Sequence, residues 1–285
     1  MATRRSDFAG SWYPSTESEC RRVIEEWVST TKPCRAQEKK YVGGIVPHAG
    51  WVFSGKVACG VIECLQTGGT RPDTFVVFGK HLHASSRNYI MKEGRWATPF
   101  GELKVDRDLA GSLLAKFPFV QETPTQYEQD NTIELQLPLI RYFFPDAMIL
   151  PIGVPPAPKS VSIGKTVAEI AASMNRTIMV IGSTDLTHYG PNYGFMPKGE
   201  GEKGLNWVKN ENDKRLRDLI LKMNAEGVLQ EALVNHNACC AGAVAAAIAA
   251  SRKLGAERGM ELFYTTSYDI RPDSSFVGYT GILFH

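Results

Sequence analysis

Short runs of apolar, β-branched residues recur along this chain, and each is followed by a stretch with helical periodicity. Runs of this kind are typical of strands that are buried on both faces of a sheet. Strands that alternate with helices predict a layered α/β/α domain with a mixed, largely parallel central sheet. Four such runs occupy residues Tyr41–Val46, Thr74–Phe78, Met148–Ile152 and Thr177–Ile181.

Two further runs, Glu261–Thr266 and Phe276–Phe284, flank a turn-rich Asp-Ile-Arg-Pro-Asp segment and are expected to pair as a hairpin. Tyr189–Gly204, with several Gly and two Pro, is expected to form a flexible loop beside a site. We find no internal repeat or linker, so we expect one domain over residues 1–285. Helical patterns lie at Thr16–Trp27, Ser54–Gln66, Arg107–Lys116, Asn131–Phe143, Ser160–Met174, Asn206–Met223, Gly227–Val234 and Ala238–Leu254.

The charge balance of the chain argues against several kinds of partner. Its 32 basic residues face 30 acidic ones, so neither nucleic acid nor a membrane surface is expected to bind it. The longest apolar run, Ala238–Ala250, falls short of the roughly 20 residues that a membrane span needs. No apolar segment follows the basic residues Arg4 and Arg5, so we expect no secretory signal and a cytoplasmic protein. Its six cysteines, Cys34 among them, form no Cys-x-x-Cys pair and are expected to be free thiols.

Polar clusters that contain histidine directly follow three of the predicted strands. They carry His48, then His81 and His83, and then Asp185 and His188. Because ligands bind outside the carboxyl ends of parallel strands, we expect these clusters to share one site. A single histidine there could instead be a hydrogen-bonded loop residue, and only one of His81 and His83 need face the site. Asp185 either orients the imidazole of His188 or caps the following turn.

Two vicinal cysteines lie at the start of the last predicted helix. Asn237 is expected to be the N-cap of that helix, which places Cys239 and Cys240 in its first turn. Amides and the helix dipole lower a thiol pKa there, so either sulfur is a candidate metal ligand or nucleophile. The competing interpretation is that both are small residues that pack the helix. Asn131 and Glu134 match a capping box that opens another helix.

Five short motifs in this order resemble the Memo family, whose fold is that of the LigB-type class III extradiol dioxygenases. Together they extend over essentially the whole chain. They are Ala9-Gly-Ser-Trp-Tyr-Pro14, Val46-Pro-His-Ala-Gly-Trp51 with Ser54-Gly55 after it, Ile133-Glu-Leu-Gln-Leu-Pro138, Ser183-Thr-Asp-Leu-Thr-His-Tyr-Gly190 and His236-Asn-Ala-Cys-Cys240.

The resemblance implies a cleft at one sheet edge that holds iron or copper. Carried onto this chain, the metal ligands are His48, His81 and Cys240, with Asp185 and His188 completing the site. It also implies association with a radical-SAM protein and an AMMECR1-type protein, beside which such proteins are often encoded.

The chain departs from the family pattern at three positions near these residues. The family's second histidine commonly follows Gly-Pro-x, whereas here His81 and His83 compete for that role. Many members have histidine where this chain has Asn131. Cys239, next to Cys240, is a possible substitute for it as a ligand.

These residues favour a metal-dependent oxygenase that acts on a small aromatic molecule or a modified peptide. Fe(II) is the favoured ion, with Cu or Zn as alternatives. His188, assisted by Asp185, is expected to be the general acid and base. The aromatic side chains near the motifs either line the substrate site or pack the core; they are Trp12, Tyr13, Trp51 and Tyr189.

Two other function classes compete with the oxygenase hypothesis. The chain is either a non-catalytic adaptor that binds a peptide or metal in an inherited cleft, or a hydrolase. In the hydrolase, Cys240 is the nucleophile and His188 the base.

Overall fold

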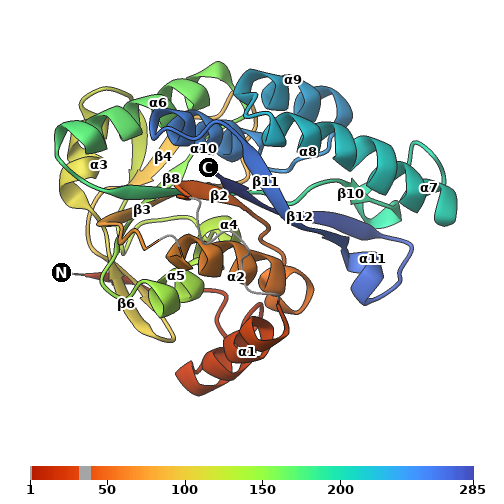
Figure 1. The fold of residues 1–285 in the computed structure, drawn as a ribbon, viewed down its shortest axis with the longest axis horizontal. Coiled ribbons are helices and arrows are strands. Elements are labelled where there is room, and N and C mark those ends of the chain that lie inside the picture. The colour runs from red at the N-terminus through yellow and green to blue at the C-terminus, as the bar shows by residue number, and fades with distance from the viewer. Residues whose placement is uncertain (1, 32–39, 68) are drawn as a thin grey trace.

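A mixed β-sheet forms the centre of the computed structural model, in which residues 2–31, 40–67 and 69–285 are described (Figure 1). Cys34 lies outside these residues. Four neighbouring strands in the middle of the sheet run parallel. On each side of these four, the next strand runs antiparallel to its neighbour. This arrangement confirms the predicted α/β fold. In spatial order the strands are β10 (His188–Tyr189), β12 (Phe276–Phe284), β2 (Gly43–Val46), β9 (Ile178–Ser183), β3 (Thr74–Gly79), β8 (Met148–Gly153), β4 (Asn88–Met91) and β7 (Phe119–Glu122), and β11 (Gly259–Thr266) pairs with β12.

Helices cover both faces of the sheet, because successive residues of a strand point to opposite faces. Ile45 packs into one hydrophobic core and Val46 into the other, and Phe78 and Val77 divide in the same way. Figure 1 shows α6, α9 and α10 on one side of the sheet, with α1, α2 and α5 on the other. The first layer contains α3 (Arg107–Leu114), α6 (Pro158–Ser173), α8 (Asp213–Leu221), α9 (Ala225–Asn235) and α10 (Ala241–Lys253), and the second α1 (Glu17–Thr30), α2 (Trp51–Thr67), α4 (Asn131–Glu134) and α5 (Leu137–Phe143).

The contact between α6 and α10 is unusually close. The side chains of α10 from Ala241 to Ser251 are all buried, and most are alanine. Opposite them, a Cβ atom added at Gly164 would overlap the backbone carbonyl of Ala246. The small residues therefore let the two helix backbones approach each other above the parallel strands.

One predicted helix is divided in the structure. The pattern over Asn131–Phe143 forms α4 and α5, with a break between them. Pro138 has no N–H to donate to the carbonyl of Glu134, so a continuous helix would lose a hydrogen bond there. The break turns α4 toward the carboxyl ends of the parallel strands.

The C-terminal hairpin pairs as predicted, with β11 antiparallel to β12. The expected helix over Asn206–Met223 consists of α7 (Glu202–Trp207), a π-helical turn (Val208–Asn212) and α8. No helix among the described residues has the length and hydropathy to cross a membrane. The remaining short elements are a 3₁₀ turn (Pro191–Tyr193), α11 (Ser267–Ile270) and a small sheet of β1 (Thr3–Arg4), β5 (Arg95–Thr98) and β6 (Gly101–Lys104).

Candidate metal centre

Three loops meet at the carboxyl ends of the adjacent parallel strands β2, β9 and β3. Val46 pairs with Ser183, and Phe78 with Gly182, so the residues that follow these strands emerge side by side. His48 is buried in the first loop, and its Nε2 lies 3.2 Å from the Nε2 of His81. The predicted convergence of the strand ends therefore brings these two imidazoles together.

Hydrogen bonds fix the ring of His48. The Ser183 hydroxyl donates to the Thr132 carbonyl, so its oxygen is left to accept from His48 Nδ1–H at 2.9 Å. The backbone N–H of His48 also donates to Asp185 Oδ1 at 2.7 Å. With Nδ1 occupied in this way, Nε2 is the ring atom presented to the cluster.

Two thiols complete the cluster. Cys239 Sγ lies 3.2 Å from His48 Nε2 and 3.8 Å from Cys240 Sγ. Ligand atoms of His48, His81, Cys239 and Cys240 all lie within 4.8 Å of one another. Imidazole nitrogen and thiolate sulfur suit zinc, copper and iron, so this donor set fits a transition-metal ion.

The electrostatics of the cluster favour an ionised sulfur. Burial alone lowers the pKa of His48, but the Asp185 carboxylate and Cys239 raise that pKa to about 9. Burial also opposes ionisation of Cys239, yet the Cys240 thiol and the His48 ring bring its pKa well below the usual range. These neighbours therefore make Cys239 easier to deprotonate, and the thiolate is the form that binds a metal ion.

The turn that carries His81 is strained. Lys80 has a φ of 76°, which is unusual for a residue other than glycine. The Lys80 amide donates to Thr132 Oγ1, and its buried Nζ lies 2.7 Å from Glu122 and 3.3 Å from Glu128. These bonds hold a conformation that proline could not adopt.

A cavity of about 650 Å³ is lined by His48 and His81 of the cluster, and neither Cys239 nor Cys240 is among its lining residues. His188 lies on its wall, with Nδ1 at 3.1 Å from the Leu186 carbonyl and its ring edge-on to Tyr193. Asp185 also lines the cavity, where it contacts His48 rather than orienting His188. The other lining residues include Ser11, Trp12, Asn131, Asn192, Ser267, Arg271, Asp273 and Tyr279.

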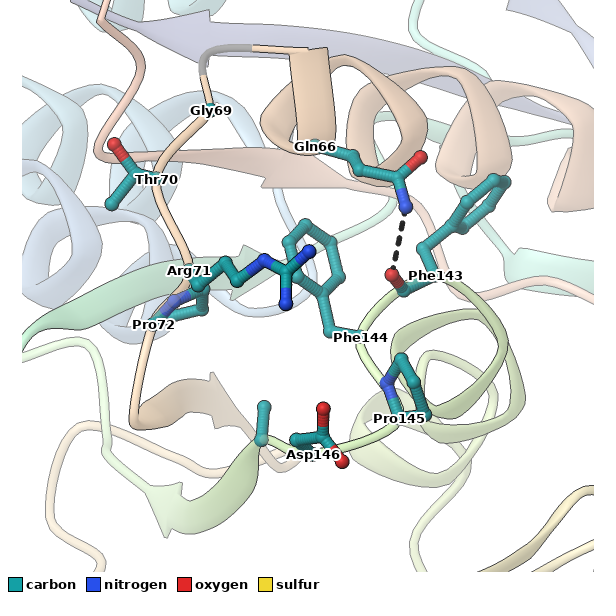
Figure 2. Close-up of a pocket in the computed structure, with 10 residues that line it drawn as sticks. Gln66, Gly69, Thr70, Arg71, Pro72, Phe143, Phe144, Pro145 and Asp146 are labelled. Carbon is teal, nitrogen blue, oxygen red and sulfur yellow. Dashed lines mark hydrogen bonds between the residues drawn. The ribbon is translucent and has the colours of Figure 1, made fainter.

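A second cavity, of about 470 Å³, lies at the opposite edge of the sheet, before β3 and β8 begin (Figure 2). Figure 2 shows Gln66 donating to the Phe143 carbonyl on one side of it, with Arg71 and Asp146 on the other walls. Its described lining contains neither histidine nor cysteine. Of these two cavities, the one at the carboxyl edge is lined by histidine.

The comparisons with known proteins agree with this geometry. The family model described as "Memo-like protein" matches residues 4–283. The chain belongs to the Memo family. It is 35% identical to a MEMO1 family protein of Pyrococcus abyssi, over 96% of this chain and 97% of that protein. It is 32% identical to one of Methanosarcina acetivorans, over 99% of each. An uncharacterized Escherichia coli protein of known structure shares the fold, with a TM-score of 0.54 at 12% identity over 85% of this chain and 99% of that one.

The family-derived ligands His48, His81 and Cys240 come together in the structure, whereas His83 is not part of the cluster. Cys239 joins them, although the Memo resemblance assigns the ligand role to Cys240 alone. The expected N-cap at Asn237 is wrong, because α10 begins only at Ala241. The Asn237 side chain instead donates to the Asn212 carbonyl and to Glu231, and both cysteines precede the helix.

The predicted capping box at Asn131 and Glu134 is also wrong. Asp130 is the N-cap of α4, and its carboxylate accepts the amide of Ile133. Glu134 is buried and accepts from the amides of Asp7 and Phe8 and from the Tyr13 hydroxyl; it therefore fixes the N-terminal segment. Asn131, which replaces a histidine of many Memo proteins, donates to the His48 carbonyl at 3.0 Å.

Of the four aromatic residues proposed to contact substrate, only Trp12 lines the cavity. Tyr13, Trp51 and Tyr189 are buried. The Tyr13 hydroxyl donates to Glu134, the Trp51 ring N–H to the Leu135 carbonyl, and the Tyr189 hydroxyl to the Gly199 carbonyl. Tyr193 and Tyr279 line the cavity in their place. Tyr193 lies within the loop that its glycines and prolines predicted, whereas no sequence signal distinguished Tyr279 on β12.

The loop that carries Asp185 and His188 rests on the π-helical turn before α8. Asn212 and Asp213 both bind the Thr187 hydroxyl, and Asp213 also accepts from the Thr187 amide and the Tyr264 hydroxyl. Burial raises the pKa of Asp213 to about 6, although these hydrogen bonds and Arg217 oppose the shift.

Asp213 predicts a specific pH dependence of stability. Its carboxyl binds a proton more tightly in the folded chain than in the unfolded one, so this contribution is largest below about pH 4 and declines as the pH rises through about 6. Between these pH values this group should cost wild type up to about 3 kcal/mol in the free energy of unfolding, and Asp213→Asn should not show this loss. Urea unfolding of the metal-free protein measures both. The control is Asp218→Asn on the exposed face of α8. Parallel pH profiles for wild type and Asp213→Asn would contradict the assignment.

Proposed function

We propose that this chain is a metal-dependent redox enzyme, an oxygenase that acts on a small aromatic molecule or a modified peptide. The observation that carries the proposal is the position of the His/Cys cluster, whose two histidines line a cavity of about 650 Å³. A pocket of this size accommodates a small-molecule ligand. Iron or copper bound there would supply the electron transfer and O₂ chemistry.

The chain's own residues prepare the site for such an ion. His48 and His81 offer two nitrogens, and the adjacent thiols offer a sulfur. Ser183 accepts a hydrogen bond from the His48 ring and Asp185 accepts one from the His48 backbone amide, so together they fix the orientation of His48. This outer set of hydrogen bonds is typical of histidines that bind metals.

His188 is suited to move a proton to or from the substrate. Because its Nδ1 donates to the Leu186 carbonyl, Nε2 is the ring nitrogen left for an acidic hydroxyl in the cavity. Trp12, Tyr193 and Tyr279 give the cavity aromatic surface on which a flat substrate can pack.

His188→Asn tests the oxygenase proposal without removing a metal ligand. We expect the variant to keep its metal content, while O₂ uptake with a panel of catechol-like compounds falls by about 10²- to 10⁴-fold. His236→Asn is the matched control, since Asn tolerates the left-handed backbone of His236, which lies at the end of α9. Unchanged O₂ uptake in His188→Asn would exclude the proton-transfer role, and no uptake by metal-loaded wild type with any compound would contradict the oxygenase proposal.

A peptide-binding adaptor is the second candidate, and the rim of the same cavity favours it. Trp12 is 40% exposed and Val52 is 75% exposed, and both line the opening. Exposed apolar side chains around a concave site are typical of surfaces that bind a partner. The radical-SAM and AMMECR1-type proteins remain proposed partners. An adaptor would bind peptide without consuming O₂, so the same O₂ measurement distinguishes the two functions.

A further inference from the structure

We propose that Cys239 is a fourth metal ligand, so that the resting centre is a closed Cys₂His₂ site for a soft ion, Cu(I) or Zn(II). The inference rests on the proposed metal-dependent function: Cu(I) is consistent with a redox enzyme, whereas Zn(II), which has no redox chemistry, would make the closed centre a structural site. The family resemblance supplies one cysteine, Cys240, whereas this chain has a second sulfur at the neighbouring position.

The spacing of the four donors supports tetrahedral binding. Metal–sulfur bonds of about 2.3 Å and metal–nitrogen bonds of about 2.0–2.1 Å place tetrahedral donors about 3.8 Å apart for two sulfurs, about 3.3 Å for two nitrogens and about 3.6 Å for a mixed pair. The corresponding separations here are 3.8 Å for Cys239–Cys240, 3.2 Å for His48–His81 and 3.2 Å for His48–Cys239. These three separations are close to the tetrahedral values, and all four donor atoms lie within 4.8 Å of one another.

The turn before α10 directs both sulfurs to the same place. The Cys239 amide donates to the Asp185 carbonyl, and the Cys240 amide donates to Thr184 Oγ1. These bonds hold the vicinal cysteines in a non-helical conformation, which keeps the two thiols on the side of His48. The loop after β9 thus positions both cysteines beside His48.

The sulfur of Cys239 also has a hydrogen-bond donor beside it that would remain if the sulfur left a bound ion. The Asp185 amide donates to Cys239 Sγ at 3.2 Å, and the Thr184 hydroxyl lies 3.7 Å away. The Thr184 hydroxyl donates to the Asp185 carbonyl, so the Asp185 amide is the group that stabilises a Cys239 thiolate not bound to metal. Cys240 Sγ, by contrast, is buried against the Lys80 carbonyl at 3.6 Å. Cys239 is therefore the ligand that can leave the ion and free a position for substrate.

The donor set decides which ion fits. Two thiolates with two imidazoles in a tetrahedron are typical of zinc, and thiolates also favour Cu(I). Catalytic sites usually keep three protein ligands and one open position, whereas four ligands close the site. The second thiolate therefore shifts the expected preference away from Fe(II) and toward Cu(I) or Zn(II).

Cobalt(II) is the probe for this proposal, because thiolate-to-cobalt charge transfer in the near ultraviolet grows with the number of bound sulfurs. We expect a 1:1 complex of wild type with the absorption of two thiolates. Cys239→Ser should still bind one ion, with about half of that absorption and roughly ten- to a hundredfold weaker affinity. Cys20→Ser is the matched control, since its buried sulfur donates to the Pro14 carbonyl and Ser can replace that bond.

X-ray absorption of the zinc-loaded wild type provides a second count, expected to give two sulfur and two nitrogen neighbours. One sulfur neighbour, or a Cys239→Ser spectrum equal to that of wild type, would overturn the four-ligand proposal and leave the proposed function intact. If wild type binds none of Co(II), Zn(II) and Cu(I), the proposed function fails as well. Thermal unfolding of the metal-free variants verifies that each is folded.

Discussion

His48→Ala should weaken metal binding by this protein by roughly a hundredfold or more. His48 Nε2 lies 3.2 Å from both His81 Nε2 and Cys239 Sγ, so its loss removes the donor that the others surround. The free energy of metal binding at a structural site is about 10–16 kcal/mol, shared among its four ligands. One ligand therefore accounts for about 3 kcal/mol, and its loss should weaken affinity by roughly a hundredfold or more. Metal analysis after anaerobic purification should show about one ion per chain in wild type and almost none in the variant.

His83→Ala is the matched control for this experiment, because His83 follows the same strand but lies outside the cluster. It should keep its full metal content. Equal metal content in His48→Ala and wild type would remove the basis of the metal centre. Loss of metal in His83→Ala, but not in His81→Ala, would show that the other histidine of this loop is the ligand.

Gly164→Ala should destabilise the fold by about 3 kcal/mol, the upper part of the usual range for overpacked cores. The added Cβ would overlap the Ala246 carbonyl, and neither backbone can move without separating α6 from α10. Urea unfolding of the metal-free protein measures the effect.

Gly111→Ala provides a control of opposite sign. Gly111 is also inside a helix, α3, but a Cβ there meets no atom within 4 Å. Alanine at an open helical position should stabilise by about 0.5–1 kcal/mol, because glycine loses more backbone entropy on folding. If both variants change stability in the same direction, close packing of α6 on α10 does not control the effect.

The buried strands could be predicted from the sequence because they are apolar on both faces. Each of the four runs that predicted parallel strands overlaps a strand of the central sheet, to within two residues at each end. β4, β7 and β10, by contrast, are only two to four residues long and depend on pairing with distant segments. The buried Arg4 of β1 illustrates the limit, since it lies between Trp96 and Tyr127. A charged residue gives no strand signal until those rings are in place.

The two histidines of the cluster could be anticipated for a similar reason. His48 and His81 directly follow predicted parallel strands, and topology alone brings such positions together. Polar side chains near helix starts were harder to interpret, because a cap and a tertiary contact require the same residue types. Glu134 looks like half of a capping box, yet its partners are more than a hundred residues away in the N-terminal segment.

The order of the ligands along the chain has a consequence for biosynthesis. His48 and His81 are 33 residues apart, but His48 and Cys239 are 191 apart. A ribosome that has made both histidines must still synthesise all of β9 and the residues up to Cys240 before all the donors exist. A metal ion that needs all four donors would therefore not guide the early folding of such a chain. It would be inserted only once the sheet edge is assembled.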